Sequence, residues 1–145
     1  MSTGFLGTKA GLVADVNLVA QGIMVLAILY GLIRVKQRAV SLHCNIMTTL
    51  AIVNGILIIG IMNPSFFRAL PAARHNLAGV NLLLLGHAGL GALAEILAIY
   101  VVIKTRSNLL APPSLRNTRT VMRVTWVLWL LNALCGGLLY ALWYL

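Results

Sequence analysis

Charged residues are scarce in this sequence, and acidic residues are almost absent. Only 9% of its 145 residues are charged, with 11 Lys+Arg against 2 Asp+Glu. A soluble domain usually has about 25% charged residues, so the composition excludes an ordinary soluble domain. The sequence also contains no hydrolase triad, phosphate-binding loop or H-E-x-x-H zinc motif. With so few ionisable groups, we do not expect catalysis by this chain alone.

Cysteine is scarce too. The two cysteines, Cys44 and Cys135, do not form a C-x-x-C pair, which argues against thiol–disulfide exchange. Their expected positions on two helices differ in depth by about 15–20 Å, whereas a disulfide needs Cα atoms within about 7 Å. The sequence therefore predicts two free thiols.

Long apolar runs, in contrast, are abundant, and they decide the fold class. Four of them span residues 12–33, 42–62, 78–103 and 121–145. Each is close to the ~20 residues that a helix needs to cross ~30 Å of hydrocarbon, and lipid offers no other hydrogen-bond partner to the backbone. The sequence therefore predicts an all-α integral membrane protein, a four-helix transmembrane bundle forming one domain over 1–145.

Two of the four prolines fall between the second and third runs. Pro64 and Pro71 are expected to end the second helix, which would make 63–77 an outer loop. Phe66 and Phe67 in that loop would then lie at the membrane interface.

The positive charges are unevenly distributed between the two sides of the predicted bundle. Eight cations follow the first and third runs: Arg34, Lys36, Arg38, Lys104, Arg106, Arg116, Arg119 and Arg123. Three lie on the other side: Lys9, Arg68 and Arg74. Because basic loops stay in the cytoplasm, we predict both termini outside a prokaryotic cytoplasmic membrane, with anionic lipids attracted to the basic rim. The basic segments have no interleaved aromatic residues, so nucleic-acid binding is not expected.

Each apolar run carries one stripe of polar residues at helical spacing, and four stripes imply one inward-facing core. At ~1.5 Å rise per residue, Gln21, Asn54 and His87 fall at about the same depth, with Asn132 about 5 Å deeper. Two interpretations are open. These side chains hold the helices together, or His87 binds a heme, a quinone or a metal. Amides are poor ligands for soft metals, whereas a quinone carbonyl suits His and Asn donors.

Glu95 is the only acidic residue expected deep inside a span. A buried carboxylate either pairs with a cation or takes up a proton. Arg123 is predicted to reach inward from the start of the last helix and to pair with it. A structural bridge, a proton-handling role and a partner-docking role stay open. A proton-coupled transporter is the weakest alternative, because no pair of broken helices marks a substrate site.

His43 and His87 are the two candidate cofactor ligands. A heme held between two helices needs both of its ligands close to the iron. The predicted depths place these histidines about 15–17 Å apart along the bundle axis, which argues against a shared heme. Separate hemes would each need another ligand, such as Met47 or a group from a partner protein.

A scattered set of residues follows a pattern known from one family. The set comprises Leu42-His43, Met47, His87, Arg119, Arg123-Val124-Thr125, Trp129, Gly136-Gly137 and Tyr140. Over residues 41–144 the chain resembles the YozB/CtaM-type family, small four-helix membrane proteins linked to maturation of heme-copper cytochrome oxidase. The resemblance implies candidate roles for His43, His87 and Arg123. Members commonly carry a further histidine just before the fourth helix; this chain has none between Arg116 and Arg119, which favours a structural role.

The resemblance and the scarcity of catalytic groups together predict a non-catalytic accessory or assembly protein of a respiratory heme-copper oxidase-type complex. Its partners would be other membrane subunits. Two alternatives stay open: a small membrane protein that binds heme or quinone for electron transfer, and a structural subunit of another energy-converting complex, such as a photosynthetic one. In the leading interpretation the polar layer holds the core together, and a Glu95–Arg123 bridge joins the third and fourth helices.

Overall fold

Helices make up nearly all of the described chain. The computed structural model describes residues 4–73, 78–106 and 115–145, with side chains for 4–70, 82–106 and 118–145, and these ranges contain no strand. Four helices there are long and apolar enough to cross a membrane: Leu12–Lys36, Val40–Leu70, Leu82–Arg106 and Thr118–Tyr144. The predicted all-α fold with four membrane-spanning helices is confirmed. Both cysteines are free, as predicted.

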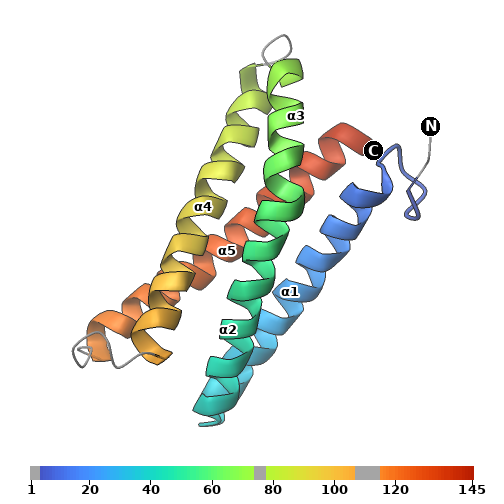
Figure 1. Cartoon of the computed structure of the whole chain (residues 1–145). Coiled ribbons are helices and arrows are strands. Elements are labelled where there is room, and N and C mark those ends of the chain that lie inside the picture. Colours follow the sequence, from blue (N-terminus) through green and yellow to red (C-terminus); the bar gives the residue numbers. More distant parts are fainter. Residues whose placement is uncertain (1–3, 74–77, 107–114) are drawn as a thin grey trace.

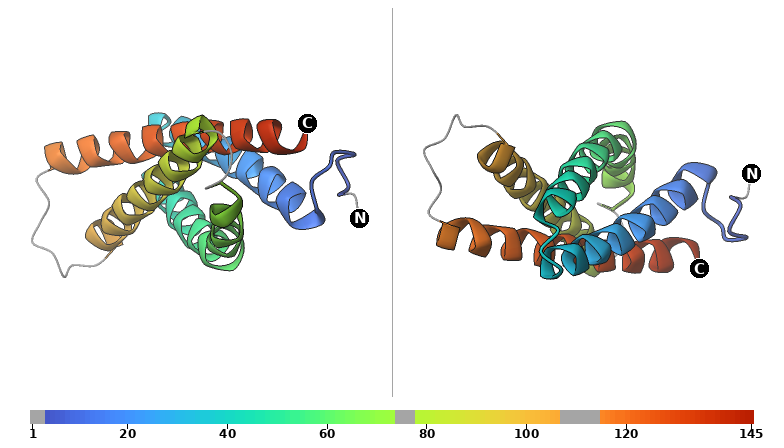
Figure 2. Two further views of the ribbon diagram at one scale, coloured as in Figure 1. Left: turned by 90° about the horizontal axis from the view of Figure 1, so that it is seen from above. Right: turned by 90° about the horizontal axis from the view of Figure 1, so that it is seen from below.

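The helices are α1 (Leu12–Lys36), α2 (Val40–Leu57), the π-helical segment η1 (Ile58–Met62), α3 (Asn63–Ala73), α4 (Ala78–Arg106) and α5 (Leu115–Tyr144). The four spans run alternately up and down in chain order, with α2, η1 and α3 forming one of them (Figure 1). Helix α1 packs mainly against α2, and α4 against α5. Views from the two ends show the helices crossing and spreading apart (Figure 2). The chain ends meet, since the Lys9 N–H donates to the Tyr144 carbonyl at 3.2 Å.

The second helix does not end at Pro64, so the prediction of an outer loop was wrong for 63–73. The remainder of that predicted loop, 74–77, lies outside the described residues. The helix continues through η1 into α3 and ends at Ala73. In an α-helix, proline lacks a donor and its ring clashes with the carbonyl four residues earlier. In η1 the Asn63 N–H bonds instead to the Ile58 carbonyl, five residues back. This wider turn relieves the clash just before Pro64 and lets the helix pass the proline.

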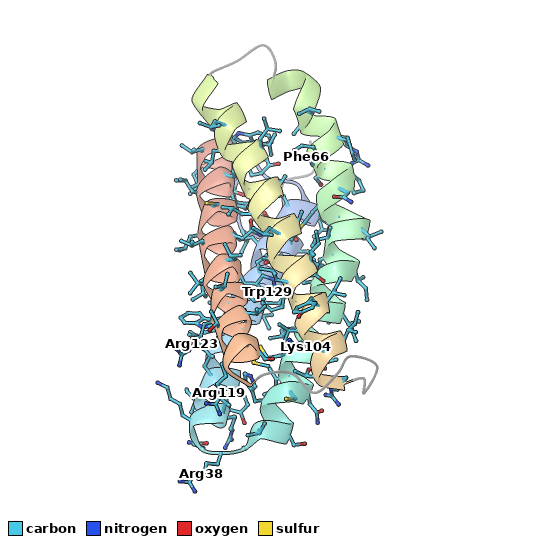
Figure 3. The ribbon with its side chains drawn as sticks, turned by 90° about the vertical axis from the view of Figure 1, so that its left-hand side faces the viewer. Arg38, Phe66, Lys104, Arg119, Arg123 and Trp129 are labelled. Atoms are coloured by element: carbon cyan, nitrogen blue, oxygen red, sulfur yellow. The ribbon has the colours of Figure 1, made fainter. Side chains whose placement is uncertain are left out.

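The core lies in the middle of the bundle, where all four spans contribute buried residues. Ala94 and Ala98 of α4 are buried near Ala51 of α2, and such small residues let membrane helices approach closely. Trp129 of α5 fills the interior (Figure 3). The buried cluster consists of Met24, Ile28, Leu50, Ala51, Ala94, Ala98 and Trp129.

Most of the described cationic side chains gather at one end of the bundle; Lys9 and Arg68 lie toward the other. Figure 3 labels four of the larger group: Arg38, Lys104, Arg119 and Arg123. Phe66 of α3 lies toward the opposite end. The two basic segments counted in the sequence therefore share one end of the molecule, and the membrane side to which that end belongs stays a prediction from charge. Two members of the charge count lie outside the described side chains: Arg74 and Arg116.

Candidate functional site

A chain of hydrogen bonds crosses the bundle at mid-height from α1 to α4. The Gln21 amide donates to Asn54 Oδ1 at 3.4 Å, and Asn54 Nδ2 donates to Glu95 Oε2 at 2.8 Å. Gly55 makes room for the carboxylate, because a Cβ there would lie 3.3 Å from Glu95 Oε1. Asn54 and Glu95 are both buried, and buried polar groups are nearly always hydrogen-bonded. The structure thus brings Gln21 and Asn54 together and adds Glu95 to them.

The predicted bridge between Glu95 and Arg123 is wrong. Arg123 is exposed on α5, among the cations at one end of the bundle (Figure 3). Glu95 instead accepts its hydrogen bond from Asn54. A long cationic side chain near the end of a span extends its head toward the interface, where the charge stays hydrated. For Arg123 this preference outweighs pairing with an acid deeper in the bundle.

His87 of α4 is bound to α5 through one ring nitrogen. Its Nδ1 lies 3.1 Å from the backbone carbonyl oxygen of Asn132. A carbonyl can only accept, so Nδ1 carries the proton and donates, and in the neutral ring Nε2 is left as an acceptor. Gly136 allows this close approach, because a Cβ there would lie 3.0 Å from the ring carbon Cε1.

A cavity of about 180 Å³ lies beside His87, in the half of the bundle away from the cations. Helices α1, α4 and α5 line it together with η1 and α3. Its polar floor consists of Asn17, Gln21, His87 and Asn132. Its aromatic walls, nearer the chain ends, are Phe66, Tyr140, Trp143 and Tyr144. A mostly apolar hollow with a few convergent polar groups is the usual form of a small-molecule site.

The polar floor has unused hydrogen-bonding capacity. Asn17 Oδ1 and Asn132 Oδ1 are buried and lack a hydrogen-bond partner. The hydrogen bond that His87 makes within the described chain uses Nδ1, which leaves Nε2 available. A second cavity, of about 10 Å³, lies between the floor and the mid-height network, lined in part by Gln21, Asn54, Trp129 and Asn132. Because buried polar groups are rarely left unpaired, the floor is suited to a partner that this chain does not supply.

The segment before α1 holds one wall of the cavity in place. Asp15 is fully buried and accepts hydrogen bonds from the Leu6 N–H at 2.9 Å and the Tyr140 hydroxyl at 2.5 Å. The Thr8 hydroxyl bonds to the same tyrosine oxygen at 2.7 Å. Sequence reasoning missed this cluster. An acid in the first turn of a helix is expected from the helix dipole alone, and nothing local links Asp15 to a tyrosine 125 residues later.

His43 makes the same kind of bond as His87 but lies elsewhere. Its Nδ1 is 2.9 Å from the Gly31 carbonyl oxygen on α1, and it lines neither cavity. On α2, His43 precedes Asn54 by eleven residues. On the antiparallel α4, His87 precedes Glu95 by eight residues, and Glu95 is level with Asn54 because the two are hydrogen-bonded. The two separations therefore add. At about 1.5 Å per residue the two histidines are roughly 28 Å apart along the bundle. They are too far apart to share an iron, as predicted, although the predicted separation of about 15–17 Å was too small.

The surroundings of His87 suit a single ring better than a heme. The cavity of about 180 Å³ is below the roughly 300–1,000 Å³ of typical ligand sites, and a macrocycle is a large ligand. Within the described residues, no three His, Cys, Asp or Glu side chains gather to hold a metal ion. The cavity beside His87 is thus small for a macrocycle, and heme binding by His43 or His87 stays a prediction.

Comparison with known proteins gives no relative for this chain. No family model matches the sequence, and no curated protein or solved structure matches it. The function is therefore argued from the residues of the chain itself.

Proposed function

We propose that this chain is a multi-pass protein of a prokaryotic cytoplasmic membrane that binds the ring head of a membrane-soluble molecule of the quinone class. One observation carries the proposal: the cavity beside His87 combines unpaired polar groups in its floor with aromatic walls. The chain acts without catalysis of its own in this proposal, since the sequence contains no hydrolase triad, phosphate-binding loop or H-E-x-x-H zinc motif.

The chemistry of a quinone-class ring complements the cavity. Such a ring carries two oxygens. In the quinol form their hydroxyls can donate to the unpaired Asn17 Oδ1 and Asn132 Oδ1, and in the quinone form their carbonyls can only accept, from amide nitrogens. Trp143 and Tyr144 offer flat faces for the ring to pack against. The cavity has room for one ring, and the hydrocarbon tail would lie in lipid.

A leucine placed in the cavity tests this proposal. Gly137 lines the cavity, and a Cβ there meets no atom within 4 Å, so Gly137→Leu introduces a bulky side chain at the cavity wall without a clash at its Cβ. It also replaces a poor helix former by a good one. Gly89→Leu on α4 is the matched control, because Gly89 has the same open surroundings but lines neither cavity.

Each protein, in lipid nanodiscs, would be titrated by calorimetry with a short-chain benzoquinone and with its quinol. We expect the natural sequence and Gly89→Leu to bind alike, and Gly137→Leu to bind roughly tenfold more weakly or not at all. A folded Gly137→Leu protein with undiminished binding would contradict the proposal.

A second candidate function is that of an accessory or assembly protein of a respiratory heme-copper oxidase-type complex. The residues that resemble the YozB/CtaM-type family support it. So do large apolar side chains that each span leaves exposed, including Leu26, Ile59, Leu82 and Leu134. In a membrane such faces contact either lipid or the helices of another subunit. A quinone-class site is compatible with a respiratory partner.

Mass spectrometry of the proteins that co-purify with the tagged chain from native membranes tests this second candidate. Stoichiometric oxidase subunits would support it. Co-purification with subunits of another energy-converting complex, such as a photosynthetic one, would support a role as a subunit of that complex and argue against the oxidase. Recovery of the chain alone would leave ligand binding as the remaining function.

A further inference from the structure

We infer that the cavity selects the hydroxyl-bearing, reduced form of its ligand, a quinol, over the corresponding quinone. This inference rests on the proposed function and adds a chemical preference to it. His87 is the residue that sets the preference, because it lines the cavity and its Nδ1 is used in the bond to α5. The ring nitrogen left for a ligand is Nε2, which in the neutral ring accepts a hydrogen bond and cannot donate one.

The backbone of α5 fixes the tautomer of His87. The Asn132 carbonyl oxygen lies 3.1 Å from Nδ1 and has no proton to give, so the ring proton sits on Nδ1. The orientation of the ring is fixed as well, since Gly136 packs against Cε1. Moving the proton to Nε2 would break the only hydrogen bond that the ring makes within the described chain.

Nε2 therefore presents a lone pair to the ligand. A quinol hydroxyl donates to such a lone pair, whereas a quinone carbonyl brings a second lone pair against it and leaves both groups unpaired. A buried acceptor without a donor is unfavourable enough to change an affinity by about tenfold or more. The preference is thus a property of one ring nitrogen.

The amides of the floor do not discriminate in the same way. A side-chain amide has a donor at one end and an acceptor at the other, and rotation about its last bond exchanges them. As placed, the unpaired atoms Asn17 Oδ1 and Asn132 Oδ1 accept from a hydroxyl, and after that rotation the amide nitrogens can donate to a carbonyl. Gln21 already donates to Asn54 at 3.4 Å. This leaves His87 as the group in the floor that distinguishes the two forms.

Two substitutions of His87 separate its role in packing from its role in selection. In His87→Asn the amide nitrogen lies near the former Nδ1 and still donates to the Asn132 carbonyl, but the acceptor at Nε2 is gone. In His87→Gln the amide lies near the former Nε2, where it can accept or donate. His43→Asn is the matched control, because His43 makes the same bond to a backbone carbonyl away from the cavity.

The probes are a short-chain benzoquinol, the matching benzoquinone and the dimethyl ether of the quinol, which keeps the ring and both oxygens but has no hydroxyl. Binding to the protein in nanodiscs would be measured by calorimetry without oxygen. We expect the natural sequence and His43→Asn to bind the quinol about tenfold more tightly than either other probe. His87→Asn should bind all three alike, and His87→Gln should bind quinol and quinone alike.

Equal binding of quinol and quinone by the natural sequence, or tighter binding of the quinone, would overturn the inference and leave the proposed function standing. Absence of binding for all three probes would overturn both. Since the comparison of probes on the natural sequence is decisive by itself, the test does not depend on the folding of any variant.

Discussion

His43 and His87 are two histidines in nearly the same local setting. Each bonds through Nδ1 to a backbone carbonyl of a neighbouring helix, at 2.9 and 3.1 Å. Each ring also lies against a glycine, Gly31 for the first and Gly136 for the second. They differ in the space beside the ring: His87 borders the cavity of about 180 Å³, and His43 borders neither cavity.

The difference teaches that residue type and bonding pattern do not by themselves make a ligand site. Both bonds hold two helices together, α1 to α2 at His43 and α5 to α4 at His87. The two interpretations that the sequence leaves open for an intramembrane histidine therefore coexist at His87. Its Nδ1 serves packing, and its Nε2 is available to a ligand because of the open space next to it.

The variant with the largest expected effect tests whether the hydrogen-bond network at mid-height is independent of the cavity. Asn54→Leu removes the acceptor of Gln21 and the donor to Glu95 together. Unpaired buried polar groups are costly, so the free energy of unfolding should fall by about 2–3 kcal/mol, as measured by titration with SDS in mixed micelles. Quinol binding by the folded protein should be unchanged. Lost binding at normal stability would mean that network and cavity act as one unit.

Leucine variants of the two histidines separate the interhelix hydrogen bond, which both residues make, from ligand binding, which is proposed for His87 alone. His43→Leu and His87→Leu each remove one interhelix hydrogen bond, and each should lower the free energy of unfolding by about 1 kcal/mol. Quinol binding, measured by calorimetry, should be lost in His87→Leu alone. The comparison breaks down if both variants weaken binding equally.

The two glycines allow a finer version of the same test. In Gly136→Ala the new Cβ would lie 3.0 Å from Cε1 of His87, and in Gly31→Ala it would lie 3.0 Å from Cε of Met47. The end of a methionine side chain can move aside, whereas the imidazole ring must shift as a whole. We expect about fivefold weaker quinol binding for Gly136→Ala and none for Gly31→Ala. The reverse order would mean that the position of the ring does not matter.

The smallest effect is expected at the turn between α1 and α2, close to His43 and far from the cavity. Arg38 has a φ of 63°, a left-handed conformation that is unfavourable for residues other than glycine. Arg38→Gly should raise the free energy of unfolding by about 0.5 kcal/mol and leave quinol binding as it is. A lower free energy of unfolding in the same SDS titration would mean that the arginine side chain stabilises the fold by more than its strained backbone destabilises it.

Apolar run length and helix rise were sufficient to predict the four spans. They were also sufficient to expect Gln21 and Asn54 at one depth, and the structure joins these two by a hydrogen bond. Such predictions succeed because a helix in lipid satisfies its own backbone and so has few alternative conformations. His87 was predicted at the same depth, but it precedes Glu95, the partner of Asn54, by eight residues, about 12 Å along α4. It bonds instead to the Asn132 carbonyl of α5.

Other features depend on contacts that no local pattern encodes. Pro64 is tolerated because of a π-turn in the preceding residues, and the same proline would end an ordinary helix. Arg123 has a long side chain whose direction the sequence leaves open. Asp15 meets Tyr140 only because the two ends of the chain come together. The cavity likewise depends on how whole helices pack.

Nitrogen-15 NMR of the histidine rings is the most direct test of the central claim, that His87 presents Nε2 to a ligand in the cavity. The protein would carry His75→Asn so that two rings remain, and spectra would be recorded in nanodiscs before and after addition of a short-chain quinol. Before addition, both rings should carry the proton on Nδ1. After addition, Nε2 of His87 alone should shift toward the value of a hydrogen-bonded acceptor. An unchanged His87 signal with quinol in excess, or an equal shift at His43, would contradict the account.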